Sequence, residues 1–190
     1  MKSTQQEGDM SQPESPEQRR TAILATAERI LRSGSPLTLG KVAQEVGISR
    51  TALYRYVSGI DEIIETLATK DFPHWLTSLR SAMAAAPTPK QRALCWAIES
   101  IKLGRETDHA WLATLSSLNL SENCRNAIAS EHSKIDQLLR VELAQLGTPH
   151  IELTVATVRA VVMTAIQTPS STEADDYFTA TISAIIDASC

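Results

Sequence analysis

The sequence has few of the residues from which active sites and metal centres are built. Its 190 residues include three cysteines and four histidines, and they contain no His-Glu-x-x-His, Gly-x-Ser-x-Gly or glycine-rich phosphate-loop pattern. Cys124 and His132 are eight residues apart, which is about 12 Å on one straight helix and too far to share an ion. We therefore expect no enzyme activity, no metal site and no cofactor.

The cysteines Cys95, Cys124 and Cys190 are also too few and too widely spaced for a disulfide framework. Their number favours a reducing compartment, so we expect a cytoplasmic protein in which the thiols are small packing residues. A redox switch is the alternative.

Long apolar runs are absent as well. Residues 1–20 contain no apolar segment of a signal peptide, and we expect a disordered tail over residues 1–15. The most apolar later segment, Val155–Ile166, is 12 residues long and carries Arg159, so it is too short and too charged to span a bilayer. With 43% hydrophobic and 21% charged residues, the composition is that of a soluble globular protein with no membrane contact.

Strand-like alternation is also absent, and apolar residues recur at helical spacing between proline, glycine and capping residues. This pattern predicts an all-α fold of about nine helices. Pro73 falls inside one of them and predicts a kink or break near residues 71–74. Besides two short helices between residues 37 and 56, the expected helices span residues 16–33, 61–86, 89–104, 109–116, 121–147, 149–167 and 172–188.

The segment Leu37–Tyr56, LTLGKVAQEVGISRTALYRY, has the pattern of two short helices joined by a glycine turn. Gly47 can end the first helix in a left-handed conformation. Ser49 is a natural N-cap for a second helix through Tyr56, with Leu53 facing inward. This pattern is typical of a helix-turn-helix DNA-binding motif, although a helical hairpin with a solvated surface would show the same periodicity.

The outward side of the second helix carries groups that suit DNA. The guanidinium groups of Arg50 and Arg55 can bind guanine or phosphate, and the hydroxyls of Thr51, Tyr54 and Tyr56 suit phosphate oxygens.

The net charge of −4 is distributed unevenly along the chain. Residues 18–57 carry a net charge of +5, whereas residues 1–17 carry −3 and residues 58–190 carry −6. The basic island coincides with the helix-turn-helix segment and supports nucleic-acid binding, although a solvated surface can show such asymmetry.

Residues 22–67, with the turn at Ala43–Ser49 and the run at Leu53–Val57, resemble the N-terminal DNA-binding domain of the TetR family of transcriptional regulators. The resemblance implies a three-helix DNA-binding domain over residues 16–60, followed by a helical ligand-binding and dimerisation domain over residues 61–190. Family members bind near-palindromic operator DNA as homodimers. They usually repress transcription until a small molecule binds the C-terminal domain.

By motif position, the resemblance places Arg50, Thr51 and Ala52 against base edges. Many family members have a Lys or Arg just after this helix, where this chain has Ile60, and the following Asp61 and Glu62 would repel a phosphate. We therefore expect moderate operator affinity and a flatter salt dependence. The expected DNA-binding residues are Thr38, Lys41, Ser49, Arg50, Thr51, Ala52, Tyr54, Arg55 and Tyr56.

Apolar residues occupy most of the circumference of the helix expected over residues 149–167, more than one core can easily bury. Together with the resemblance, this predicts a four-helix dimer interface, although a purely intramolecular core is the alternative. The expected interface residues are Val155, Val158, Val162, Ile166, Phe178, Ile182, Ile185 and Ile186.

All three tryptophans lie beyond residue 74, in the part of the chain where family members build a ligand pocket. The expected ligand-binding residues are Trp75, Met83, Trp96, His109, Trp111, Leu115, Met163 and Gln167, although residues of these types are more often plain core or surface.

The leading prediction is a ligand-responsive transcriptional regulator, in the simplest case a repressor that a small-molecule effector releases from its operator. The alternative is a helical small-molecule carrier or protein-interaction module without specific DNA binding. Such a protein would not need the Arg50–Tyr56 surface.

Overall fold

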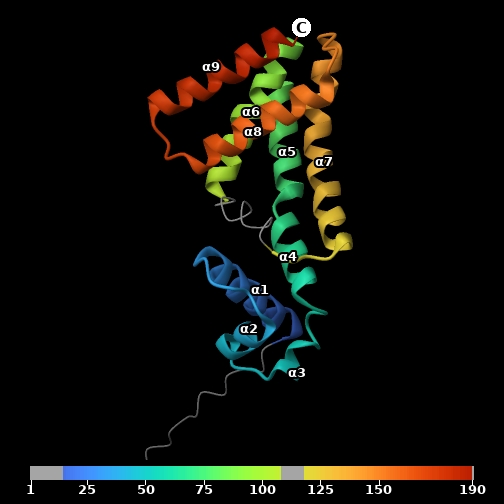
Figure 1. The fold of residues 1–190 in the computed structure, drawn as a ribbon, viewed down its shortest axis with the longest axis vertical. Helices are drawn as coiled ribbons and strands as arrows, with labels where there is room; N and C mark the ends of the chain where they lie inside the picture. Colours follow the sequence, from blue (N-terminus) through green and yellow to red (C-terminus); the bar gives the residue numbers. More distant parts are fainter. Residues whose placement is uncertain (1–14, 108–117, 190) are drawn as a thin grey trace, which may run out of the picture. The chain divides into compact units, whose positions relative to one another are not determined.

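The structure, a computed structural model, describes residues 15–107 and 118–189. Within these residues every regular element is a helix, and the helices α1 to α9 follow one another along the chain (Figure 1). The all-α prediction is therefore confirmed. The chain divides into two compact units, Met1–Ile63 and Ile64–Cys190. None of the described helices is both long enough and apolar enough to cross a membrane.

The first unit contains α1 (Pro16–Arg32), α2 (Leu39–Val46) and α3 (Arg50–Leu53). α1 begins at a capping box. The Ser15 hydroxyl accepts from the Gln18 amide at 3.2 Å, and the Gln18 side chain accepts from the Ser15 amide at 2.7 Å. The small apolar core of this unit includes Ile23, Ala27, Ile30, Val42, Ala43, Leu53 and Val57.

The long helix expected over residues 61–86 is two helices, α4 (Ile60–Thr69) and α5 (Phe72–Ala84). Pro73 is the second residue of α5, where a missing amide proton costs no intrahelical hydrogen bond. Pro73 could not continue α4, because its ring would clash with the preceding turn. The interruption expected at residues 71–74 therefore exists, and it lies at Lys70 and Asp71.

The second unit continues with α6 (Pro89–Glu106), α7 (Glu122–Gln145), α8 (Ile151–Gln167) and α9 (Thr172–Ala188). The helix expected over residues 109–116 lies outside the described residues. α6 is central, because α5, α7, α8 and α9 all contact it. Its buried Trp96 donates its indole N–H to the carbonyl oxygen of Ile135 on α7 at 3.0 Å.

α6 and α8 approach each other closely near their C-terminal ends. A Cβ atom on Gly104 of α6 would lie 2.4 Å from Cδ1 and 2.7 Å from Cγ1 of Ile166 on α8. The next residue, Arg105, donates to the carbonyl oxygen of Ala165 at 2.9 Å and pairs with Asp175 of α9 at 2.9 Å. Arg105 thus meets the negative end of the α8 dipole and fastens the turn between α8 and α9.

Candidate DNA-binding interface

The turn between α2 and α3 has the conformation that the sequence predicts. Gly47 ends α2 with φ 76° and ψ 31°, a left-handed conformation that costs glycine little. The amide of the next residue, Ile48, donates to the Ala43 carbonyl at 3.0 Å and closes the end of the helix. The Ser49 hydroxyl then accepts from the Ala52 amide at 3.0 Å and caps α3.

α3 is shorter than the sequence predicts, since it ends at Leu53 and not at Tyr56. The amides of Arg55 and Tyr56 instead donate to the carbonyls three residues back, at 3.1 and 3.0 Å. Such bonds tighten the last turn of a helix without interrupting it abruptly. Leu53 is fully buried beneath this turn and anchors it to the core of the first unit.

The predicted DNA contacts lie at or near the surface of this segment. Tyr54 is 49% exposed, and its hydroxyl accepts from the Arg50 guanidinium at 3.4 Å, so these two side chains lie along one edge. Thr38 and Ser49 use their hydroxyls as N-caps of α2 and α3. Exposed or partly exposed side chains are those of Thr38, Lys41, Ser49, Arg50, Thr51, Ala52, Tyr54, Arg55 and Tyr56.

Ion pairs divide the basic residues of the first unit into two groups. Three arginines of α1 are bound to carboxylates at 2.7–2.9 Å, in the pairs Arg20–Glu62, Arg29–Glu45 and Arg32–Glu28. Within the part of the chain that the structure describes, no ion pair involves Lys41, Arg50 or Arg55. The uncompensated positive charge is therefore concentrated on the helix-turn-helix.

Glu62 closes the turn that follows α3. Its carboxylate accepts from the amide and the hydroxyl of Ser58 at 2.7 and 2.8 Å, and from Arg20 at 2.8 Å. These bonds, with the one from the Ser58 amide foremost, hold the pKa of Glu62 below its usual value. The expected repulsion of a phosphate by Glu62 is thus reduced, because Arg20 compensates its charge. Sequence reasoning missed this contact, since Arg20 lies 42 residues earlier in the chain.

Five of the eight predicted ligand-binding residues are described, and His109, Trp111 and Leu115 are not. The structure brings Trp75, Met83 and Trp96 into one buried apolar cluster of the second unit, with Met163 packed against it. Gln167 is exposed instead, and it lines a shallow hollow beside Gly104 and Arg105.

The residues expected at a dimer interface lie mainly inside one chain. Ile185 is partly buried, and the other seven, Val155, Val158, Val162, Ile166, Phe178, Ile182 and Ile186, are at most 9% exposed in the core of the second unit. Because a covered side chain offers no area to a second copy, this choice of residues needs correction. For these seven, the intramolecular alternative describes the structure.

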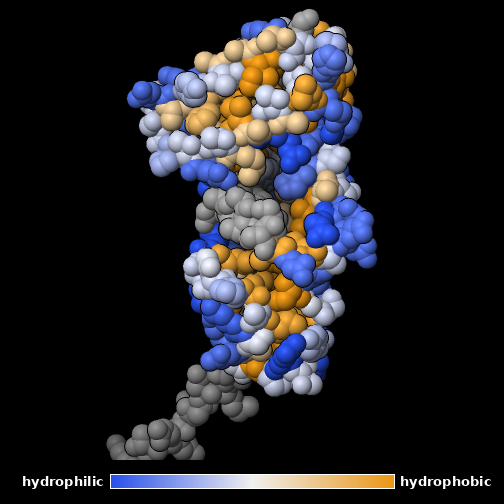
Figure 2. All heavy atoms as spheres, viewed as in Figure 1, coloured by the Kyte–Doolittle hydropathy of each residue, from blue (hydrophilic) through white to orange (hydrophobic). Residues whose placement is uncertain are grey.

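The opposite sides of the same two helices are exposed. We define the outer face as Leu153, Ala156, Thr157, Ala160 and Thr164 of α8 together with Tyr177, Ala180, Ala184 and Ala188 of α9. The residues that define this face are uncharged, and exposed charged residues of the same two helices, among them Arg159, Glu173, Asp176 and Asp187, lie beside them. In Figure 2 the region of α8 and α9 is accordingly coloured mostly orange, tan and pale, with blue residues at its margin.

The chain thus combines a helix-turn-helix unit with exposed basic residues and a larger all-helical unit. The fold is similar to that of solved structures of TetR-family transcriptional regulators. No protein-family model matches the chain, and no curated protein does. The likeness is therefore one of structure.

Three solved structures illustrate the likeness. The TetR-family regulator PfmR from Thermus thermophilus is 16% identical with a TM-score of 0.68, over 87% of this chain and 94% of that one. AibR in complex with isovaleryl coenzyme A and operator DNA is 14% identical with a TM-score of 0.67, over 88% and 97%. FadR from Bacillus subtilis in complex with stearoyl-CoA is 13% identical with a TM-score of 0.64, over 88% and 95%.

Proposed function

We propose that this protein is a ligand-responsive transcriptional regulator, most simply a repressor, that binds a near-palindromic operator as a homodimer. One observation carries the proposal. Lys41, Arg50 and Arg55, on and beside the exposed side of a capped helix-turn-helix, have no carboxylate partner among the described residues, while three arginines of α1 do. These uncompensated charges thus coincide with the helix-turn-helix, as expected of a surface that attracts the phosphates of DNA.

The arrangement suggests a role for each exposed group. Arg50, Thr51 and Ala52 face base edges in the major groove, with the Arg50 guanidinium steadied by the Tyr54 hydroxyl. Tyr54, Tyr56 and Lys41 bind phosphates, and Arg55 binds either a base or a phosphate. Thr38 and Ser49 cap the two helices and add hydroxyls at the phosphate backbone.

The outer face is the dimer surface in this proposal. An uncharged surface of alanine, threonine and one leucine on α8, beside alanine and one tyrosine on α9, lets two helix pairs pack closely. A two-fold dimer then presents two recognition helices to successive major grooves, which matches a near-palindromic operator.

The effector site lies in the second unit, around the cluster of Trp75, Met83 and Trp96. Two proteins of the same fold, AibR and FadR, form complexes with acyl thioesters of coenzyme A, and the AibR complex also contains operator DNA. Acyl coenzyme A compounds are therefore the first class of effector to test. Release from DNA requires that the effector bind the DNA-free state more tightly than the DNA-bound state.

The DNA-binding proposal is tested by selecting bound sequences from a random duplex pool with the full chain, followed by anisotropy titrations. Arg50→Ala should weaken binding to the selected sequence about tenfold or more and relax the preference at one base pair. Arg80→Ala, which removes an exposed arginine on α5, is the matched control and should leave binding unchanged.

The salt dependence gives a second, independent test. Among the described residues, the helix-turn-helix of each chain has three uncompensated cations, so a dimer can neutralise at most six phosphates there. The slope of log K against log salt concentration should then be no steeper than about −5. Lys41→Ala removes two of these cations from the dimer and should make the slope shallower by about two units. If no sequence is enriched and Arg50→Ala binds DNA as the unchanged protein does, the regulator proposal fails and the carrier alternative is favoured.

A further inference from the structure

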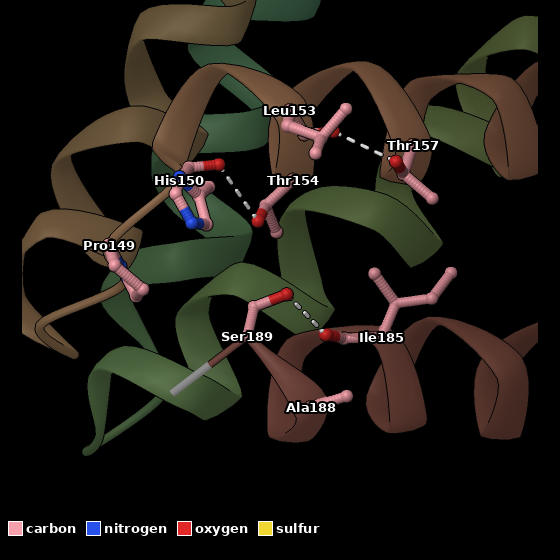
Figure 3. A pocket seen from close by; sticks show the side chains of 8 residues that line it. All are labelled: Pro149, His150, Leu153, Thr154, Thr157, Ile185, Ala188 and Ser189. Carbon is pink, nitrogen blue, oxygen red and sulfur yellow. Dashed lines mark hydrogen bonds between the residues drawn. The ribbon is translucent and has the colours of Figure 1, made fainter.

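The outer face has a projection at one end of α9 and a hollow at the other. Tyr177, near the start of α9, is 68% exposed. The hollow lies between the start of α8 and the end of α9 and has a volume of about 370 Å³ (Figure 3). Its lining includes Leu153 and Thr157 from α8 and Ile185 and Ala188 from α9. Eight to eleven residues separate Tyr177 from this part of α9, which is about 12–16 Å along the helix.

The hollow presents apolar groups, because the hydroxyls at its wall are bonded to the backbone of their own helices. Thr157 donates to the Leu153 carbonyl at 2.8 Å, and Ser189 donates to the Ile185 carbonyl at 2.7 Å (Figure 3). Thr154 likewise donates to the carbonyl four residues before it, at 3.1 Å. Side-chain methyl and methylene groups remain, together with the imidazole ring of His150, and an aromatic ring is a suitable guest for such a lining.

Three of the charged residues that border the outer face are already paired within the chain, whereas no ion pair among the described residues involves Glu173 or Asp176, which lie beside Tyr177. Arg159 binds Asp136 at 2.9 Å, Glu152 binds Arg140 at 2.7 Å, and Asp187 binds Lys90 at 2.6 Å. Within the described residues the Tyr177 hydroxyl makes no hydrogen bond, and its ring lies edge-on to Phe178 at a centroid distance of 5.8 Å. Tyr177 is thus the one large side chain on the α9 half of a face made otherwise of alanines.

We propose that, in the homodimer, Tyr177 of each chain inserts into the hollow of the other chain. A two-fold axis that crosses α9 at right angles near its middle makes the two copies of α9 antiparallel. The projection of each chain then meets the hollow of the other, and both hollows are filled by one symmetric contact. The inference rests on the proposed homodimer and adds the contact that sets its register.

A second copy suits the hollow better than a free small molecule does. The face around the hollow is made mostly of small side chains, and the acidic residues at its margin, Glu152 and Asp187, are paired with Arg140 and Lys90, so a partner helix can lie against it while its tyrosine enters the hollow. Tyrosine anchors that fill pockets near the centre of an interface commonly dominate its affinity.

The dimer dissociation constant of the full chain, measured by sedimentation equilibrium, tests the contact. Tyr177→Ala removes two identical contacts per dimer and should weaken the dimer about a hundredfold, taking tenfold for each. Tyr177→Phe keeps the ring and should change the constant less than threefold. Val141→Ala, at a 45% exposed apolar residue of α7, is the matched control and should have no effect.

The outcomes separate the two proposals. If Tyr177→Ala dimerises as tightly as the unchanged chain, the inserted tyrosine is refuted while the homodimer stands. If the unchanged chain stays monomeric at every concentration tested, the homodimer itself is refuted, and this contact with it.

Photocrosslinking locates the contact directly. A chain with p-benzoylphenylalanine at position 177, mixed with an isotope-labelled copy and irradiated, should form intermolecular crosslinks to residues 149–157 or 185–189. Crosslinks between chains that fall elsewhere, for example between the two copies of position 177, would overturn the antiparallel register.

Discussion

Gly104→Ala should destabilise the second unit, although the same substitution usually stabilises a helix. Alanine is favoured over glycine inside a helix by about 1 kcal/mol. Here the added Cβ would lie 2.4 Å from Cδ1, 2.7 Å from Cγ1 and 3.3 Å from Cγ2 of Ile166. Rotation about the terminal bond could move only the first of these atoms, and a β-branched side chain in a helix has one strongly preferred χ1 rotamer.

The magnitude follows from these two opposing effects. Inserting a methyl group into a packed core costs about 1–3 kcal/mol. After the helix gain of about 1 kcal/mol is subtracted, we expect a net loss of up to about 2 kcal/mol in the free energy of unfolding, or up to about 8 °C in Tm for a chain of this size. Urea denaturation followed by tryptophan fluorescence suits this test, because every tryptophan lies in the second unit.

The control is the same substitution without the obstructing side chain. In an Ile166→Ala background, Gly104→Ala should become stabilising by about 1 kcal/mol, because only the helix preference remains. Ile166→Val, which deletes Cδ1 alone, should restore part of the loss. If Gly104→Ala stabilised the unchanged protein, the close approach of α6 and α8 would be refuted.

Three further predictions concern single residues. Because its folded pKa is lowered, Glu62 contributes stability above pH 4.5 that is lost as the pH falls through the folded value. Glu62→Gln should therefore lower the free energy of unfolding by about 1 kcal/mol at pH 7, after allowance for the partial exposure of this side chain. It should also make this free energy, followed by circular dichroism, depend less on pH in the acid range. Gly47→Ala should cost about 1–2 kcal/mol at its left-handed φ, whereas Gly40→Ala, with open space at its Cβ, should not destabilise in the same urea titration. Burial raises the pKa of Asp136 against the opposing effect of Arg159, so the folded state holds the proton more tightly and stability falls as the pH rises above 3.8. Asp136→Asn should remove this fall and leave the protein at least as stable at pH 7, and a loss of several kcal/mol would contradict that view.

Local features of the fold could be predicted from the sequence because neighbouring residues determine them. Gly47 and Ser49 end one helix and begin the next through their own backbone and hydroxyl groups. Pro73 interrupts a helix wherever it lies in the fold. The end of α3 was less predictable, because residues 54–56 are equally compatible with a further helical turn and with the tighter bonds that the structure shows.

Contacts between distant segments could not be predicted in this way. The partners Arg20 and Glu62 are separated by 42 residues, and nothing in their local sequence identifies the pair. The apolar residues of α8 posed a different problem, since a helix apolar on many sides does not reveal which side its own core will cover. Packing on α6 buried Val155, Val158 and Val162, and left the alanines, threonines and Leu153 outside.

In the proposed homodimer, the composition of the outer face has a consequence for pairing with paralogous chains. Many helical interfaces reject unrelated partners through like charges, which cost free energy when brought together. The residues that define the outer face are alanine, threonine, leucine and tyrosine, so they distinguish their own copy from a paralogue by shape, and only the charged residues at the border can add charge repulsion. A paralogue with a small residue at the position of Tyr177 would leave the hollow empty. A change of this one side chain could thus separate two such homodimers after gene duplication.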